Sequence, residues 1–155
     1  MSELKQMPLL TITAESLMIP SEKVAHVQMN NPLEHALLIL VKSGYSAVPV
    51  LDTTYKFKGV IGKNPILNHV LGLERFEMER LSQIEVQEVM NTSIPCVNKQ
   101  DEFLTCLKTV INYPFVCVVD EEGYFDGILT RRVILKEFNK YVHLNKSLFE
   151  ELEEE

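Results

Sequence analysis

The chain has 155 residues, of which 46% are hydrophobic and 24% are charged, and this balance predicts one soluble globular domain. No apolar run approaches the roughly 18 residues of a membrane span, and no basic stretch followed by a long apolar one opens the chain, so we expect a cytoplasmic protein without a membrane partner. Three cysteines without a CxxC pair argue against a disulfide framework and against a zinc site.

The net charge of -7 is concentrated at the C-terminus. Residues 150–155, EELEEE, hold five of the 22 acids, which leaves 17 acids against 15 bases in the rest of the chain. We expect residues 144–155 to form an acidic tail that is solvated or frayed. The charge of the whole chain argues against general coating of DNA, but it leaves room for a local basic pocket.

The first predicted helix follows Asn31, the expected N-cap, with Pro32 at the first helical position. Its apolar residues fall on one helical face, and Gly44 ends it: Leu33, Ala36, Leu37, Leu40 and Val41. The short apolar runs AVPVLD and FKGVIG are typical of strands joined by a turn. A second helix is predicted over NPILNHVLG, and residues 73–90 indicate a charged, partly helical connection.

The same order returns after the connection. Asp101 is the expected cap of a helix whose apolar face is formed by Phe103, Cys106, Leu107, Val110 and Ile111. Two strands, FVCVVD and FDGILT, and a final helix beginning RRVILKEF follow it.

An internal repeat explains this order. Residues 45–70 align without gaps on residues 113–138 at a shift of 68, so that Tyr45 meets Tyr113 and Gly59 meets Gly127. Upstream the shift becomes 70 and then 72. Each copy therefore has the order strand, helix, strand, strand, helix, and neither is large enough to bury its apolar faces alone. The predicted fold class is α/β (α+β), with two βαββα units related by a pseudo-two-fold axis.

These features resemble a tandem pair of cystathionine-β-synthase (CBS) domains, a Bateman module. The features that match are LM and VM ahead of the copies, the VPV and VCVVD strands, and the GVIG and GILT strand ends. The resemblance implies a first CBS motif over 10–72, a connecting helical segment over 73–86, and a second motif over 87–143. The chain is more closely similar to the small stand-alone CBS-pair proteins of Gram-positive bacteria that bind cyclic di-AMP, as judged from KVAHVQ, NPLEHALLIL, GYSAVPVLD, GLER and GILTRRVILKE.

The segment Thr130-Arg131-Arg132 carries the clearest binding signal. Thr130 stands where its hydroxyl can cap the final helix or reach a ribose. The free amides of the first helical turn and the helix dipole favour an anion there. The guanidinium groups of Arg131 and Arg132 suit phosphate oxygens. The alternative is a pair of solvated or Glu-paired arginines at an exposed helix start.

The family resemblance implies the rest of the pocket. Lys23 would be a further phosphate contact, and Val24, Ala25 and His26 would offer backbone edges to an adenine. Tyr45 would stack on a base while Ser46 and Ala47 line the wall. Because Tyr113 is its counterpart in the repeat, Tyr45 can equally have a packing role.

The absence of a carboxylate at one position narrows the choice of nucleotide ligands. Many nucleotide-binding CBS units have an Asp three residues after the Thr, where it holds two ribose hydroxyls, but this chain has Val133 there and Pro65 in the first copy. In a cyclic dinucleotide one hydroxyl is esterified, so a carboxylate would repel the nearby phosphate. This favours cyclic di-AMP over AMP, ATP or S-adenosylmethionine. The first copy lacks the hydroxyl and the arginine pair, so we expect one site per chain.

The sequence does not indicate an enzyme or a resident cofactor. It has no nucleophile and base at recognisable spacing and no P-loop or Gly-rich dinucleotide motif, and its four histidines lack metal-ligand spacing. A ligand-free interaction module would leave the arginine pair unexplained, whereas a nucleotide sensor explains it. The resemblance further implies a homodimer, and regulation of a metabolic or alarmone-synthesising enzyme, such as a guanosine tetraphosphate synthetase, when ligand is absent.

Overall fold

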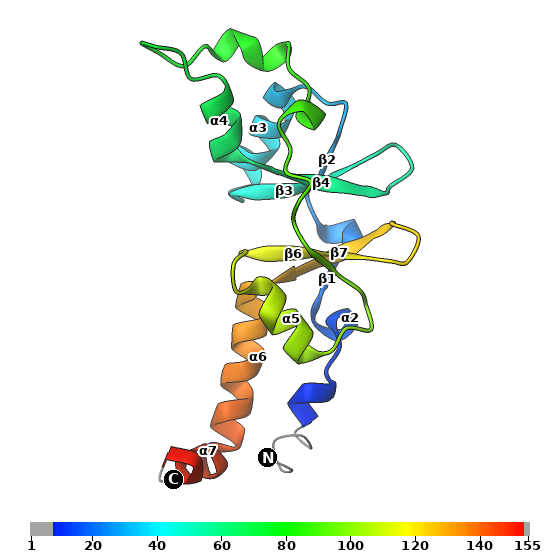
Figure 1. Cartoon of the computed structure of the whole chain (residues 1–155), viewed down its shortest axis with the longest axis vertical. Helices are drawn as coiled ribbons and strands as arrows, with labels where there is room; N and C mark the ends of the chain where they lie inside the picture. The colour runs from blue at the N-terminus through cyan, green and yellow to red at the C-terminus, as the bar shows by residue number, and fades with distance from the viewer. Residues whose placement is uncertain (1–7, 154–155) are drawn as a thin grey trace. The chain divides into compact units, whose positions relative to one another are not determined.

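The computed structural model describes residues 8–153, and it has the expected order of elements (Figure 1). The first copy consists of β2 (Val27–Gln28), α3 (Leu33–Ser43), β3 (Ala47–Leu51), β4 (Phe57–Gly62) and α4 (Lys63–His69). The second consists of β5 (Cys96–Val97), α5 (Phe103–Val110), β6 (Phe115–Val119), β7 (Phe125–Thr130) and α6 (Arg131–Leu144). Four short elements precede them: η1 (Pro8–Thr11), α2 (Ala14–Leu17), β1 (Ile19–Pro20) and η2 (Ser21–Lys23). The predicted α/β class with two βαββα copies is confirmed.

The described residues divide into two compact units. The first-copy unit comprises Ser21–Ile94 together with Val119–Phe125, which is the hairpin turn of the second copy. The second-copy unit comprises residues 8–20, 95–118 and 126–153. Each unit therefore takes one piece of chain from the part of the sequence that belongs to the other copy.

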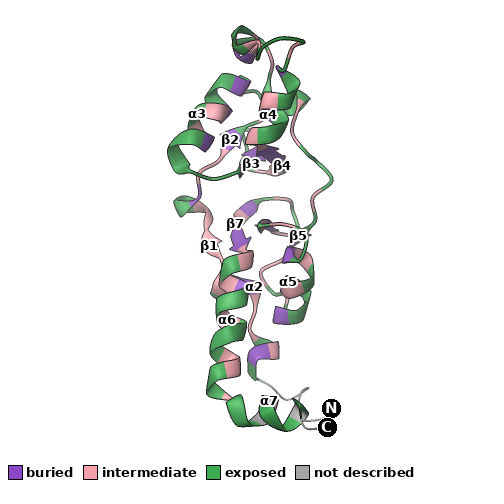
Figure 2. Cartoon of the chain, turned by 90° about the vertical axis from the view of Figure 1, so that its left-hand side faces the viewer, coloured by how far each residue is buried: buried purple, intermediate pink, exposed green. Residues whose placement is uncertain are grey.

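The first-copy unit has a three-stranded sheet in the order β2-β3-β4. Strand β2 is parallel to β3, as a connection through a helix requires, and β3 is antiparallel to β4. Helices α3 and α4 cover one face of this sheet, and the buried residues lie where helices and sheet meet (Figures 1 and 2). The core consists of Val27, Leu33, Ala36, Leu40, Val48, Val50, Ile61, Ile66, Val70, Leu81 and Val86.

The second-copy unit has a four-stranded sheet in the order β1-β7-β6-β5, with β5 parallel to β6. Helices α5 and α6 cover one face of it (Figure 1). Its core consists of Leu9, Ala14, Val97, Phe103, Cys106, Val110, Val116, Val118, Leu129 and Ile134. Leu9 and Ala14 come from the N-terminal segment, so this segment is part of the second-copy core.

The segment that leads into each copy pairs with the last strand of the other copy. In the second-copy unit, β1 is antiparallel to β7, with Ile19 opposite Ile128. In the first-copy unit, Val60 of β4 and Asn91 exchange two backbone hydrogen bonds of 2.8 and 3.0 Å. This pairing of each leading segment with the other copy was not predicted from the sequence. It occurs at equivalent positions of the repeat, because Val60 is the counterpart of Ile128.

The repeated glycines Gly59 and Gly127 are explained by this pairing. A β-carbon on Gly59 would lie 2.7 Å from the carbonyl oxygen of Asn91. One on Gly127 would overlap the carbonyl oxygen of Ile19. A side chain at either position would therefore push the paired segment off the strand.

The predicted helix caps are wrong by one residue in both copies. The N-caps are Pro32 and Glu102, without a capping side chain, and not Asn31 and Asp101. Asn31 and Asp101 instead close the turn before the helix, because each side-chain oxygen accepts a 2.8 Å hydrogen bond from the amide three residues earlier. Such local bonds compete with capping. The predicted end of α3 is confirmed, since Gly44 has the left-handed conformation, with φ 77°.

The predicted apolar faces are only partly buried. Leu33, Ala36 and Leu40 have no exposed surface, but Val41 is 61% exposed. Its counterpart in the second copy, Ile111, follows the last residue of α5 and is 63% exposed. Matched aliphatic side chains are thus left on the surface of both copies, where burial within the unit does not explain them.

Equivalent aspartates organise the two hairpin turns. The amides two and four residues after Asp52 and Asp120 donate hydrogen bonds of 2.8–3.1 Å to the Oδ1 atom of the aspartate. At Asp52 the hydroxyl of Thr54 donates a further bond of 2.6 Å. The Thr54 hydroxyl, together with backbone amides and Lys58, lowers the pKa of Asp52 from 3.8 to about 2, against a smaller opposing effect of burial.

This lowered pKa predicts that Asp52 stabilises the fold only where it is ionised. Its contribution should be fully present above pH 3.8 and should disappear as the pH falls from 3.8 towards 2, because protonation is easier in the unfolded chain. Asp52→Asn removes the charge and keeps an acceptor. We expect the melting temperature of Asp52→Asn to lie below that of the wild type at pH 6, and the difference to shrink as the pH falls from 3.8 towards 2. A constant difference across this range would contradict the assignment.

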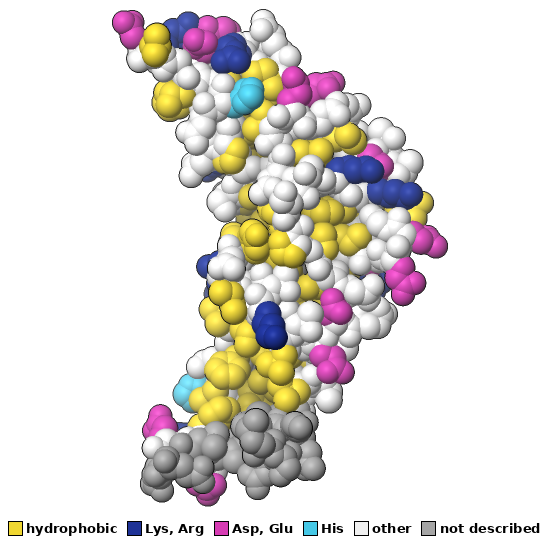
Figure 3. Space-filling view, in the orientation of Figure 1, with side chains coloured by type: hydrophobic (Ala, Val, Ile, Leu, Met, Phe, Trp, Pro, Cys, Tyr) yellow, Lys and Arg dark blue, Asp and Glu magenta, His cyan; other side chains and the backbone are white. Residues whose placement is uncertain are grey.

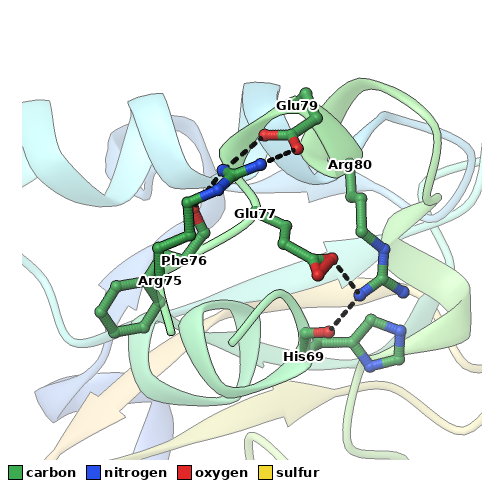
Figure 4. A network of polar contacts seen from close by, with 6 residues as sticks. All are labelled: His69, Arg75, Phe76, Glu77, Glu79 and Arg80. Atoms are coloured by element: carbon green, nitrogen blue, oxygen red, sulfur yellow. Dashed lines mark hydrogen bonds and ion pairs between the residues drawn. The ribbon is translucent and has the colours of Figure 1, made fainter. Parts of the chain in front are cut away.

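The connection between the copies contains two 3₁₀ helices, η3 (Met78–Ser82) and η4 (Val86–Glu88). Local ion pairs lie around η3 (Figure 4), and a capping box between Glu85 and Glu88 starts η4. Arg75 donates two hydrogen bonds to the carboxylate of Glu79, at 2.7 and 3.2 Å, and lowers the pKa of Glu79 to about 2. Arg80 lies 3.8 Å from Glu77 and donates to the carbonyl of His69. These exposed pairs fix the local chain path, while burial of Leu81 and Val86 attaches the connection to the core.

The acidic tail is helical over most of its length and is not frayed there, while its described acids Glu150, Glu151 and Glu153 are exposed to solvent. Lys146–Glu153 form α7. The ring of Phe149 meets those of Phe138 and Tyr141 edge to face, with centroids 6.4 and 6.3 Å apart. Beside these solvated acids, the aromatic ring of Phe149 provides an apolar contact with α6 that composition did not indicate. Glu154 and Glu155 lie outside the described residues.

Two general features bear on function. Among the helices described, none combines the length and apolarity needed to cross a bilayer. Within residues 8–153, no three His, Cys, Asp or Glu side chains lie close enough together to hold a metal ion.

Candidate functional site

The start of α6 has the geometry that the sequence indicated. Thr130 is the N-cap, in an extended conformation, and its Oγ1 accepts a 3.1 Å hydrogen bond from the amide of Val133. The threonine thus satisfies one of the free amides of the first turn and fixes where the helix begins. Arg131 and Arg132 are the first two helical residues, next to the positive end of the helix dipole.

The two arginines have different surroundings. Arg131 is half-buried, its amide donates to the carbonyl of Pro114 at 2.9 Å, and its Nε donates to the carbonyl of Val110, also at 2.9 Å. Arg131 therefore satisfies the carbonyl of the last residue of α5. Arg132 is exposed and makes no hydrogen bond or ion pair with another described residue. Of the pair, Arg132 has the guanidinium available for a ligand.

A pocket of about 480 Å³ opens beside these arginines in the second-copy unit. It is lined by Pro114, Arg131, Arg132, Leu135, Lys136 and Asn139. Three of the described lining residues are cations and none is acidic. Lys136 lies one helical turn after Arg132, so both long side chains leave α6 on the same side. This arrangement suits a ligand that combines phosphate with an apolar surface.

The other predicted site residues lie in the first-copy unit, in two groups. Lys23 ends η2 and is exposed, Val24 is buried, and Ala25 and His26 are partly buried just before β2. The Nδ1 atom of His26 lies 3.1 Å from the carbonyl oxygen of Val24. This short bend keeps the segment 23–26 compact before it enters the sheet.

The second group precedes β3. Tyr45 is 47% exposed, Ser46 is exposed, and Ala47 begins the strand. The carbonyl of Ser46 accepts a 3.0 Å bond from the amide of Lys63, so it is engaged by the first residue of α4. Because nearly half of the surface of Tyr45 is exposed, its aromatic ring is accessible to a base.

The first-copy groups lie at the same edge of one sheet. Strands β2 and β3 are parallel neighbours in a register that pairs Val27 with Val50, so the residues that precede the two strands enter the sheet from the same end. The structure thus brings the segment 23–26 to the segment 45–47. The segment 130–132 lies in the second-copy unit.

The corresponding position of the first copy lacks these features. Helix α4 begins at Lys63 after Gly62, which has no side chain to cap it, and α4 has 7 residues against 14 in α6. The first copy therefore offers neither a hydroxyl nor a pair of guanidinium groups at its helix start.

Sequence reasoning missed one cation and misjudged another. Lys136 shares the pocket of Arg132, and a search for cations four residues apart on the predicted helix would have found it. The hydrogen bond from Arg131 to Val110 joins residues 21 positions apart, and a local sequence pattern does not predict it.

Comparison with known proteins agrees with the class that the fold and the repeat define. The CBS domain family model matches residues 14–70 and 86–140. The chain belongs to the CBS-domain family, as a tandem CBS pair.

The chain is also similar to individual members of this family. It is 52% identical over 147 residues to "Cyclic di-AMP receptor B" of Bacillus subtilis (strain 168), covering 94% of this chain and 100% of the relative. A structure of the Listeria monocytogenes CbpB protein in complex with c-di-AMP is 47% identical, with a TM-score of 0.78, covering 84% of this chain and 97% of that one. A CBS domain-containing protein of unknown function from Bacillus anthracis is 56% identical, with a TM-score of 0.81 and coverage of 85% and 96%.

Proposed function

We propose that this chain is a non-catalytic sensor that binds cyclic di-AMP between its CBS copies. The observation that carries the proposal is the capped start of α6, where Arg131, Arg132 and Lys136 surround one pocket. Two relatives support the choice of ligand, since one is named as a cyclic di-AMP receptor and the other binds c-di-AMP in its crystal structure. Binding and regulation, without catalysis, account for all of these features.

The proposed contacts follow from the chemistry of each group. Arg132 binds a phosphate, with Arg131 and Lys23 as further cations and Thr130 as the helix cap that presents them. The backbone of Val24, Ala25 and His26 contacts an adenine edge, and Tyr45 stacks on a base beside Ser46 and Ala47. Because α4 lacks the cap and the guanidinium pair, we propose one site per chain.

The choice of cyclic di-AMP over AMP or ATP depends on Val133. Its amide is held by Thr130, and its side chain offers no carboxylate for two free ribose hydroxyls. AMP or ATP binding, as in an energy sensor, is the alternative. Labelled cyclic di-AMP bound to the purified protein should be displaced by unlabelled cyclic di-AMP and not by a hundredfold excess of AMP, ATP or cyclic di-GMP. Equal displacement by AMP or ATP would favour the alternative.

We propose that the ligand-free form binds a metabolic or alarmone-synthesising enzyme, such as a guanosine tetraphosphate synthetase. A ligand can release a partner only if it binds more tightly to the partner-free conformation. Immobilised protein should therefore retain such an enzyme from a cell extract, and added cyclic di-AMP should release it. Equal retention with and without ligand would count against this part of the proposal.

We further propose a homodimer formed through helical surfaces. Exposed aliphatic side chains occur at matched positions of both copies, at Val41 and Ile111, and hydrophobic side chains gather along α5 and α6 (Figure 3). The variant Val41→Glu/Ile111→Glu should convert a dimer into a monomer of 17.8 kDa in size-exclusion chromatography with light scattering, because charges buried at an interface are strongly unfavourable. Leu73→Glu changes a fully exposed leucine outside both helices and is the control. A wild-type monomer would refute the proposal.

A further inference from the structure

Tyr55 has a left-handed backbone conformation, which residues other than glycine rarely adopt. Its φ of 74° makes it the one non-glycine residue with positive φ among residues 8–153. The repeat places it over Gly123, where φ is 95°. The two hairpin turns therefore require the same left-handed residue, and the first copy has a tyrosine where the second has the glycine that fits without strain. A strained residue persists only when its surroundings hold it in place.

The ring of Tyr55 makes two aromatic contacts that a glycine at this position could not make. It meets the ring of His26 edge to face, with centroids 5.4 Å apart and planes at 86°. On another side it contacts Phe125, at 6.2 Å and 61°, and Phe125 is 2% exposed. Glycine at position 55 would have no ring to touch His26. Through His26, the segment 23–26 thus contacts an aromatic ring of the first hairpin turn.

The backbone of Tyr55 is fixed as firmly as its ring. Its carbonyl accepts a 3.1 Å hydrogen bond from the amide of Phe125, and the amide of Phe57 donates to the carbonyl of Gly123 at 2.9 Å. The two turns thus form an isolated antiparallel bridge, with Lys56 opposite Tyr124, within the first-copy unit. The backbone of Tyr55 is consequently fixed by the paired turn although 37% of the residue is exposed, and the ring of the partly buried His26 packs against it.

We propose that Tyr55 is a positioning residue for the nucleotide site, holding the segment Lys23–His26 in its binding conformation through the ring of His26. This inference rests on the proposed function, because Lys23 to His26 are the proposed contacts to cyclic di-AMP. Preorganisation of a binding segment raises affinity, since the ligand need not order that segment. The proposal also gives the repeat a reason to differ at this position.

The test compares three variants of the full-length protein. Tyr55→Gly removes the ring and relieves the backbone strain, whereas Tyr55→Phe keeps the ring. Tyr124→Gly removes a ring from the paired turn that contacts Lys56, and it is the matched control. We expect Tyr55→Gly to bind cyclic di-AMP roughly three- to tenfold more weakly, as the loss of one aromatic pair implies, and the other two to bind as the wild type does.

Hydrogen exchange distinguishes positioning from a general loss of structure. In Tyr55→Gly, the amides of residues 23–28 should exchange faster while those of α3 keep their rates, and Tyr55→Phe should restore the slow rates. Unchanged affinity in Tyr55→Gly, or weaker affinity without faster exchange in 23–28, would overturn the proposal. A wild type that does not bind cyclic di-AMP would refute the proposed function, while the exchange rates would still test whether Tyr55 holds the segment.

Discussion

Arg132→Met should weaken cyclic di-AMP binding by about 10- to 100-fold without lowering the melting temperature. Hydrogen bonds to a charged group each contribute about 1.5–3 kcal/mol, and a factor of ten in affinity corresponds to about 1.4 kcal/mol. Arg132 is exposed and its side chain has no hydrogen-bond or ion-pair partner among the described residues, so its replacement removes no polar contact from the folded chain. The measurement is a binding isotherm for each variant at one salt concentration.

Two controls separate this contact from the general effect of charge. Lys140→Met removes a cation from the same helix outside the pocket, and it should leave affinity within about twofold. Arg131→Met should instead lower stability as well as affinity, because Arg131 caps the carbonyl of Val110. Equal losses for Arg132→Met and Lys140→Met would show that the phosphate does not lie at the start of α6.

Gly127→Ala should destabilise the protein by about 2–3 kcal/mol, the largest effect that we expect from adding one methyl group. The new β-carbon would overlap the carbonyl oxygen of Ile19, so β1 must leave β7 or the strand must bend. A side-chain rotation cannot relieve this overlap, because the backbone sets the positions of both the β-carbon and the carbonyl oxygen. The free energy of unfolding from urea titrations measures the loss.

The other glycines give a graded comparison. Gly59→Ala should destabilise less, because its β-carbon would lie 2.7 Å from the carbonyl oxygen of Asn91. A β-carbon at position 44 would have no atom within 4 Å. Gly44→Ala should therefore lower the free energy of unfolding only through the left-handed backbone conformation, by about 1 kcal/mol. If Gly127→Ala were no worse than Gly44→Ala, the pairing of β1 with β7 would be wrong.

The sequence predicted those features that depend on local pattern. The alignment of residues 45–70 on 113–138 was enough for both βαββα copies, since periodicity and turn residues act over a few positions. It also located the start of α6, because a threonine before two arginines is itself a local signal. Conversely, Asn31 and Asp101 suit both a cap and the turn before it, and sequence alone does not separate neighbouring positions.

Features that join distant parts of the chain were not predictable in this way. Strand β1 has two residues, Ile19 and Pro20, and such a segment has no period from which to infer a partner. Its pairing with β7 depends on tertiary packing, as does the contact of Phe149 with α6. The role of Tyr55 was visible in principle, because the repeat sets a tyrosine over Gly123, but its meaning required the observed φ.

Isothermal titration of the wild-type protein with cyclic di-AMP decides whether the chain is a sensor of this nucleotide. We expect saturable binding with a stoichiometry near one per chain, since α6 has a capped start with two arginines and α4 does not. AMP, ATP and cyclic di-GMP, titrated under the same conditions, should bind far more weakly. Absence of binding by cyclic di-AMP, or a stoichiometry of two per chain, would contradict this expectation.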